Sequence, residues 1–360
     1  MSACRFLYQN HIPGPWALSL SSARPGLVGM PAPRAAGSAL AYAAGEHTGA
    51  LDQVFLVEID SVQAGSQVGR ATFRWRRADS ASWEAGGVPT SASFTPLADG
   101  VRIKWVSGQG DDFALGDSWS ILAARSAGAV ALLDRDRDSQ WCATACAGQW
   151  LEADLAQPRR VRALVLADHN LGDTARVRLL AGDTPDWSAP AYSLEPAVTR
   201  PHLVAFLDQE RRYWRLELDD PDNPEGLLRA SQLFLGDYFE PSRGFRRGYT
   251  RSLVAGRALT ATDAGKLAGS ARSLGQRWHL AFSLLDQQDL AGFQEMYRTV
   301  HDAQRGDLNP IFFTPFLSQP ADTLYCLPGA ELSWRHLHQG GAGGRFALEM
   351  TLEEVLRSHA

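Results

Sequence analysis

The stretch QWLEADLAQPRRVRALVLADHN, residues 149–170, decides which fold this chain is expected to adopt. It holds two apolar runs, residues 149–155 and 160–168, with Pro, Asp and Asn between or after them. Further short apolar runs follow as far as residue 240, and none of them sustains the period of a helix. Short runs separated by turn residues are typical of antiparallel strands, so residues 129–240 predict a β-sandwich.

The residues before this block predict another sandwich. Residues 69–76 (GRATFRWR) and 100–106 (GVRIKWV) place apolar side chains at every second position, as a half-buried antiparallel strand does. We therefore expect residues 41–128 to form a small β-sandwich. Residues 1–40 contain two strand-like runs, Arg5–Tyr8 and Trp16–Leu20, and then a stretch rich in Pro, Gly and Ala that is typical of a linker or crossover.

The last block, residues 241–360, predicts one helix among strands. Five apolar residues share one face at helical spacing: Leu290, Phe293, Met296, Tyr297 and Val300. Asp286 or Asp289 can cap the start of this helix, and Gly306 can end it. Strand-like segments stand on both sides of the helix, so we expect an α+β domain in which one helix packs on a sheet.

Charge and composition exclude several classes of protein. The formal net charge is −5 and lysine occurs only at Lys104 and Lys266, so the sequence predicts no nucleic-acid recognition. No apolar stretch approaches the ~20 residues of a spanning helix, and the N-terminus lacks a signal-peptide pattern. We therefore expect a soluble protein, made in a cytoplasm, that does not insert into a membrane.

The four cysteines form neither a zinc-ligand pattern nor a disulfide framework. We expect free, buried thiols, and a disulfide between Cys142 and Cys146 stays open as the alternative.

Five motifs in the third block resemble those of a discoidin-type, galactose-binding-like sandwich. They are an Asp-rich turn leading to Trp at 134–141, a strand at 150–155, a strand ending in Asn at 161–170, an aromatic-x-Arg-Leu strand at 213–216, and a final strand at 233–236. The family also starts with a strand pair around Ser-Ser, which residues 19–22 can supply. The resemblance then implies that residues 1–40 and 129–240 form one discontinuous domain, with 41–128 inserted in a loop.

The flanking blocks resemble modules of bacteriophage tails, and the last block resembles the ring-forming domain of distal-tail and tail-tube proteins. The best interpretation is a non-enzymatic structural protein of the tail tip or baseplate of a long-tailed phage, synthesised in the bacterial host cytoplasm and located in the virion. The resemblance implies a ring of copies, joined by a long hairpin within Tyr249–Leu285. Its neighbours would be tail-tube, tape-measure and baseplate proteins, and the sandwiches could contact host glycans.

Two other functions stay open: a soluble carbohydrate-binding lectin or adhesin, and an accessory module of a polysaccharide-degrading enzyme. No catalytic motif is present, and a glycosidase pair at Glu152 and Asp154 is less consistent with the pattern than ordinary charges on a strand face. His336 and His338 share a strand face as well, but no third metal ligand accompanies them.

Two candidate sites follow. Sugar sites combine aromatic platforms with polar groups at loop ends, so the carbohydrate-binding candidates are Asp168, His169, Asn170 and Trp187; the alternative is a purely architectural sandwich. The metal candidates are Asp134, Asp136 and Asp138, whose alternate carboxylates can converge on a structural Ca²⁺; the alternative is a solvated acidic turn. No other cofactor is expected.

Overall fold

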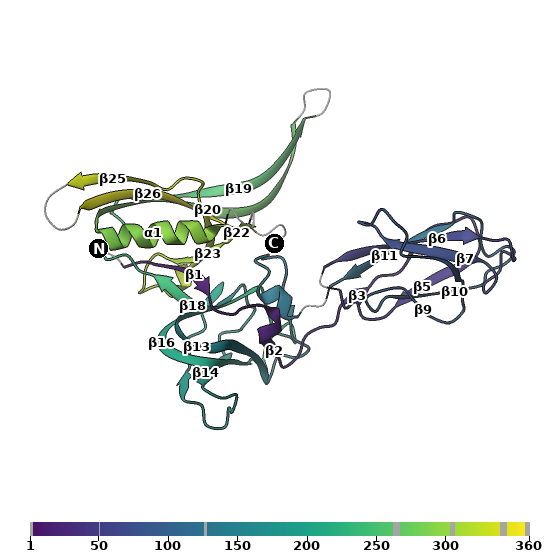
Figure 1. Cartoon of the computed structure of the whole chain (residues 1–360), viewed down its shortest axis with the longest axis horizontal. Coiled ribbons are helices and arrows are strands. Elements are labelled where there is room, and N and C mark those ends of the chain that lie inside the picture. Colours follow the sequence, from purple (N-terminus) through teal and green to yellow (C-terminus); the bar gives the residue numbers. More distant parts are fainter. Residues whose placement is uncertain are drawn as a thin grey trace. The chain divides into compact units, whose positions relative to one another are not determined.

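The computed structural model describes residues 3–49, 51–125, 128–261, 267–302, 307–338 and 344–356. The chain divides into two compact units, one made of residues 1–22 and 129–360, the other of residues 23–128 (Figure 1). Within the described residues the fold is mainly β, all strand pairs are antiparallel, and there is one α-helix. Among those residues, no helix is both long and apolar enough to cross a membrane.

The smaller unit consists of two sheets that enclose an apolar core. Its strands are β3 (Leu27–Val28), β4 (Ala32–Arg34), β5 (Leu40–Ala44), β6 (Gln53–Ser61), β7 (Thr72–Arg77), β8 (Ala85–Pro89), β9 (Thr95–Pro96), β10 (Arg102–Val106) and β11 (Ser118–Ala124). One sheet has the order β3-β11-β6-β7-β8, with β4 also on β11, and the other has the order β5-β10-β9. Phe73 of the first sheet packs against Trp105 of the second, with ring centroids 4.9 Å apart.

The smaller unit begins at residue 23 rather than at residue 41, where the sequence placed its start. The reason is that β3 and β4 pair with β11 and belong to this unit. Pro and Gly in residues 25–37 suggested a linker, but short strands with Pro occur at sheet edges, where a missing N–H costs little.

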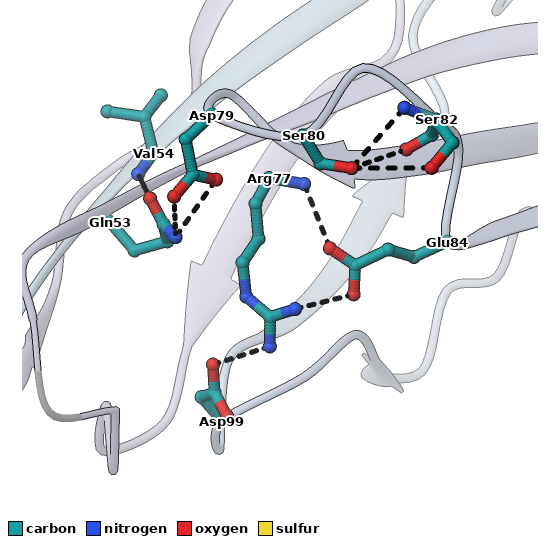
Figure 2. A network of polar contacts seen from close by, with 8 residues as sticks. All are labelled: Gln53, Val54, Arg77, Asp79, Ser80, Ser82, Glu84 and Asp99. Carbon is teal, nitrogen blue, oxygen red and sulfur yellow. Dashed lines mark hydrogen bonds and ion pairs between the residues drawn. The ribbon is translucent and has the colours of Figure 1, made fainter.

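A polar network joins the two sheets of the smaller unit at one end (Figure 2). The guanidinium of Arg77, at the end of β7, donates to Glu84 and to Asp99, at 2.8 Å each. Hydrogen bonding to Asp99 raises the pKa of Arg77. Because Asp99 precedes β10, Arg77 connects one sheet to the loop of the other.

The larger unit contains one extended sheet. Its longer strands are β1 (Arg5–Asn10), β13 (Gln149–Ala167), β14 (Arg176–Gly182), β16 (His202–Asp219), β18 (Gln232–Phe239), β19 (Thr250–Ala261), β20 (Leu267–Leu285), β23 (Ile311–Thr314), β24 (Leu324–Pro328), β25 (Ser333–His338) and β26 (Arg345–Glu354). Its shorter strands are β2 (Leu18–Leu20) and β15 (Tyr192–Leu194). Two small separate sheets of this unit are formed by β12 (Trp141–Cys142) with β17 (Arg229–Ala230) and by β21 (His301–Asp302) with β22 (Asp307–Leu308). The strand order is β15-β14-β16-β13-β18-β1-β23-β24-β26-β20-β19, with β2 on β13 and β25 on β26.

Residues 149–167 form one long strand, β13, where the sequence predicted two short ones. Its register with β16 shifts between Asp154 and Arg159, and Ala156 has a positive φ of 65°. These irregularities bend the strand at AQPRR, so that it continues through a segment whose polar residues and Pro indicated a turn. The first half of β13 also pairs with β2, and the second half pairs with β18.

No boundary separates residues 129–240 from residues 241–360 in the contact pattern of the chain. Strand β1 pairs with β18 on one side and with β23 on the other, so the sheet continues from one block to the next. Phe6 of β1 is fully buried and lies 4.9 Å, between ring centroids, from Phe313 of β23. The N-terminal segment is therefore part of the core beneath the helix as well as of the sandwich.

Helix α1 (Gln287–Val300) has the predicted capping residue and the predicted buried face. Asp286 is the N-cap and forms a reciprocal capping box with Asp289. Of the five stripe residues only Tyr297 is not fully buried, and its hydroxyl donates to the carbonyl of Gly329. The helix ends at Val300, and the predicted end at Gly306 lies outside the described residues.

All four cysteines are free thiols, so the alternative disulfide between Cys142 and Cys146 does not form. Cys4 and Cys326 are buried in the core, and burial raises the pKa of Cys4 to about 12.

Candidate functional site

Three of the four predicted sugar-binding residues lie together at one end of the sandwich. Asp168, His169 and Asn170 follow directly after β13, and all three line a cavity of about 350 Å³. Gly172 of the same loop also lines the cavity, and the segments before and after β16 complete it with Arg200, Pro201, Pro224, Glu225 and Arg229. The cavity therefore forms where three segments meet, although its residues range in sequence from Asp168 to Arg229.

The carboxylate of Asp168 forms an ion pair within the protein. The guanidinium of Arg137 binds both carboxylate oxygens, at 2.8 and 2.6 Å, and the Ser231 hydroxyl donates to one of them at 2.9 Å. Burial alone would lower the pKa of Arg137, but the hydrogen bonds and charges of Asp168 and Glu354 together outweigh it and raise that pKa. Because the pair is almost entirely buried and the carboxylate already accepts these hydrogen bonds, Asp168 has a structural role at the cavity.

His169 and Asn170 also hold the loops in place. The Nδ1 atom of His169 accepts a hydrogen bond from the Leu171 N–H at 3.2 Å. The Nε2 atom donates to the Thr199 carbonyl at 2.9 Å. Burial lowers the pKa of His169, which agrees with a neutral ring that uses both nitrogens. The Asn170 amide donates to the Leu227 carbonyl and accepts the Arg229 N–H, at 2.9 Å each.

The polar groups that face solvent at this cavity were missed by the sequence reasoning. They are Arg200, Glu225 and Arg229, whose side chains are 57%, 42% and 39% exposed. Arg229 and Glu225 form an ion pair at 2.8 Å, and the Arg200 Nε donates to the Leu171 carbonyl. The available signal was that these residues lie in Pro-containing loops between strands, but such loops are common in this chain.

The predicted aromatic residue Trp187 does not belong to this cavity. It lies in the segment between β14 and β15, is partly exposed, and does not line the cavity. Trp141 is fully buried and donates from its indole to the Ser22 carbonyl, so it is a core residue, as expected for that position.

The predicted metal residues do not converge. Asp134 and Asp136 each accept the backbone N–H two residues further on, at 3.0 and 2.9 Å, and the side chains of Asp136 and Asp138 are exposed. In the part of the chain that the structure describes, no group of three or more His, Cys, Asp or Glu residues could hold a metal ion. This geometry fits the alternative of a solvated acidic turn and gives the calcium prediction no support.

The carboxylates at Glu152 and Asp154 are each paired with an arginine of β16. Glu152 contacts Arg215 at 3.0 Å, and Asp154 contacts Arg212 at 2.8 Å. Hydrogen bonding to Arg212 lowers the pKa of Asp154. These contacts are cross-strand ion pairs on a sheet surface, which agrees with the sequence-based preference for a structural role.

No family model matches the sequence, and no curated protein matches it. Solved structures similar to part of the chain include a fucose binding module of Streptococcus pneumoniae, with 15% identity over 31% of this chain and 87% of the module and a TM-score of 0.26. The lectin domain of lectinolysin complexed with Lewis B antigen has 16% identity over 29% of this chain and 81% of that domain, with a TM-score of 0.24.

A family 32 CBM from C. perfringens NanJ in complex with galactose has 12% identity over 31% of this chain and 85% of that module, with a TM-score of 0.25. Likenesses with such low scores establish neither fold nor function by themselves. They do not bear on the expected tail-tip context, which stays a prediction.

Proposed function

We propose that this protein is a non-enzymatic carbohydrate-binding protein that recognises a sugar at the loop end of its sandwich. The cavity of about 350 Å³ beside His169 carries the proposal. Ligand sites are concave and combine an apolar lining with a few converging polar groups. Here Pro201 and Pro224 supply apolar surface, and Arg200, Glu225 and Arg229 supply exposed donors and acceptors.

The polar groups of this cavity suit hydroxyl groups. A guanidinium presents several N–H donors in a fixed plane, and a carboxylate accepts from two hydroxyls at once. Arg229 and Glu225 already contact one another, so their orientation is set before a ligand arrives. The buried pair of Asp168 and Arg137 ties the loop that begins at Asp168 to the segment that contains Arg137.

The test is a glycan array followed by titration calorimetry of the full chain with galactose and fucose. We expect Arg229→Ala and Arg200→Ala each to weaken binding about tenfold or more, because a hydrogen bond to a charged group contributes ~1.5–3 kcal/mol. Arg160→Ala is the matched control, since Arg160 lies on the same sandwich in an exposed pair with Asp208. Absence of sugar binding by the wild type, or equal affinity of the two variants and the control, contradicts the proposal.

A second candidate is an oligomeric structural protein, as expected for a tail tip, and the open edges of the extended sheet favour it. Within the described residues β19 pairs only with β20, and β25 pairs only with β26. Figure 1 shows the β19–β20 hairpin reaching beyond the rest of this sheet. Leu253 and Leu274 on the hairpin are 74% and 71% exposed, and β25 exposes Trp334.

An exposed apolar edge strand favours pairing with another chain. If β19 of one copy pairs with β25 of the next, the contact is head-to-tail, and it forms a ring where the rotation between copies closes and an open filament where it does not. Light scattering of the wild type at high micromolar concentration should then show oligomers. Leu253→Asp combined with Leu274→Asp should give monomers, and Leu115→Asp, at another exposed leucine, should not. A wild type that stays monomeric contradicts self-assembly.

A further inference from the structure

A larger concave surface lies on the outward face of β13, β16 and β14. Its volume is about 800 Å³, more than twice that of the cavity beside His169. Trp150, Arg215, Glu217 and Arg178 lie on its floor, and the segment 195–198 after β15 lines one side. We call this surface the Trp150 groove.

The floor of the groove is a pair of cross-strand rows. Trp150, Glu217 and Arg178 stand opposite one another on β13, β16 and β14, and Glu152 stands opposite Arg215 in the next row. The alternation of β13 turns Trp150 outward while Gln149 and Leu151 are buried. A half-buried indole on the outer face of a sheet is not needed for the core, so the part of its apolar surface that Arg215 does not cover is available to a ligand.

The charged side chains around Trp150 are fixed by one another. The Arg215 guanidinium lies over the indole, 4.8 Å from the ring centroid, and contacts Glu152 at 3.0 Å and Glu217 at 3.2 Å. Arg178 donates twice to the same Glu217, at 2.9 and 2.7 Å. These ion pairs hold the donors and acceptors in place. Ligand binding therefore costs less side-chain entropy, because the side chains are already ordered.

The charge balance of the groove selects the ligand class. Three arginines line it, at 176, 178 and 215, together with four acidic residues, at 173, 195, 217 and 219. The two signs nearly cancel, so the groove provides neither the cationic surface that an anionic polymer needs nor the acidic surface that a polycation needs. It provides an aromatic platform surrounded by paired donors and acceptors, which fits a neutral, hydroxyl-rich chain.

We propose that the Trp150 groove is a second carbohydrate site, which binds a neutral oligosaccharide lying across the indole. This inference shares with the proposed function only the class of ligand, because the two surfaces share no residue. The cavity beside His169 takes a terminal sugar, and the groove takes internal units of a chain. Two sites on one sandwich raise the affinity for a polysaccharide through effective concentration.

The experiment is native gel electrophoresis of the full chain through gels that contain neutral soluble polysaccharides: hydroxyethyl cellulose, xyloglucan, galactomannan and neutral galactan. Titration calorimetry with hexasaccharides of the retarding polymer then gives the affinity. We expect Trp150→Ala to weaken binding about tenfold or more, with Trp150→Phe retaining a large part of it. Arg178→Ala, at a half-exposed side chain, should also weaken binding and tests the groove without touching the indole.

Trp16→Ala is the matched control, because Trp16 belongs to the same unit and is 75% exposed. Neither Trp16→Ala nor Arg229→Ala should change the affinity for a hexasaccharide. The proposal is overturned if none of these polymers retards the wild type, or if Trp150→Ala and Arg178→Ala, with native melting temperatures, bind as the wild type does. If the polymers retard the protein but it binds no monosaccharide, the proposed sugar site in the cavity beside His169 is contradicted. The proposed site in the Trp150 groove is then still supported.

Discussion

Replacement of Asp168 by Asn should destabilise the larger unit far more than replacement of an exposed acidic residue. The side chains of Arg137 and Asp168 are only 9% and 3% exposed, and they form two charge-assisted hydrogen bonds. A third contact joins Arg137 to the carbonyl of Val355, after the last strand, at 2.6 Å. Asp168→Asn leaves the buried guanidinium with only the longer contact to Glu354, at 3.4 Å, as a counter-charge.

Breaking a buried ion pair by removing one partner costs ~3–5 kcal/mol. In a unit of about 250 residues, each kcal/mol lowers the melting temperature by ~2–4 °C, so the expected drop is about 6–20 °C. The double variant Arg137→Met/Asp168→Leu should recover a large part of this loss, because it removes both charges and leaves neither buried alone. Asp208→Asn, in the exposed pair with Arg160, should change stability by less than ~1 kcal/mol.

The assay is differential scanning calorimetry of the full chain, with urea unfolding followed by tryptophan fluorescence as a second measurement. The reasoning fails if Asp168→Asn melts within about 2 °C of the wild type, since a buried pair cannot be removed at so small a cost. It also fails if the double variant loses as much stability as Asp168→Asn does. Either result would mean that water reaches the pair.

Three further predictions concern other parts of the chain. Arg77→Met in the smaller unit should cost about 1 kcal/mol, measured by urea unfolding, because its pairs with Glu84 and Asp99 are only partly buried. Asp286→Ala should cost ~1 kcal/mol through loss of the helix cap, with Asp286→Ser as the variant that keeps it; equal losses in both would argue against capping. Burial places the folded pKa of His169 below the ~6.5 of the unfolded chain, so its contribution to stability is fully present above ~6.5 and is lost as the pH falls towards the folded value. The melting temperature of the wild type should therefore fall from pH 7.5 to pH 5 more steeply than that of His169→Gln, and parallel curves would refute this.

Local patterns in the sequence were sufficient to predict the helix and the first of the loops that line the cavity beside His169. The stripe around Phe293 and the Asp286 cap act within a few residues of one another, so the sequence alone predicts helix α1. Asp168, His169 and Asn170 were found because a strand that ends in polar residues places them at a loop. Their engagement by Arg137 and Thr199 could not be predicted, because it depends on contacts about 30 residues away.

The same limit explains what the sequence did not show. Arg200, Glu225 and Arg229 reach the cavity through the pairing of β13 with β16 and the path of the loops, which no local pattern encodes. The sequence analysis identified Trp150 only as part of a strand motif and not as part of a site. A one-dimensional pattern does not show that segment 195–198 lies beside it. The bend of β13 was missed because its polar middle resembles a turn.

Strand β1 gives a physical reason to treat the sandwich and the helix-backed sheet as one binding body. It pairs with β18 through residues 6–10 and with β23 through residues 5–7, so both edges of this single strand are used. Phe6 on one face joins the core beneath α1, and Leu7 on the other lies in the cluster with Val165 and Phe234. If a sugar binds at the sandwich as proposed, paired backbone connects it, with no linker between, to the open edges at β19 and β25. If copies join at those edges, the sandwiches are held at fixed spacing, and weak sites for single sugars add up to firm attachment to a surface that repeats them.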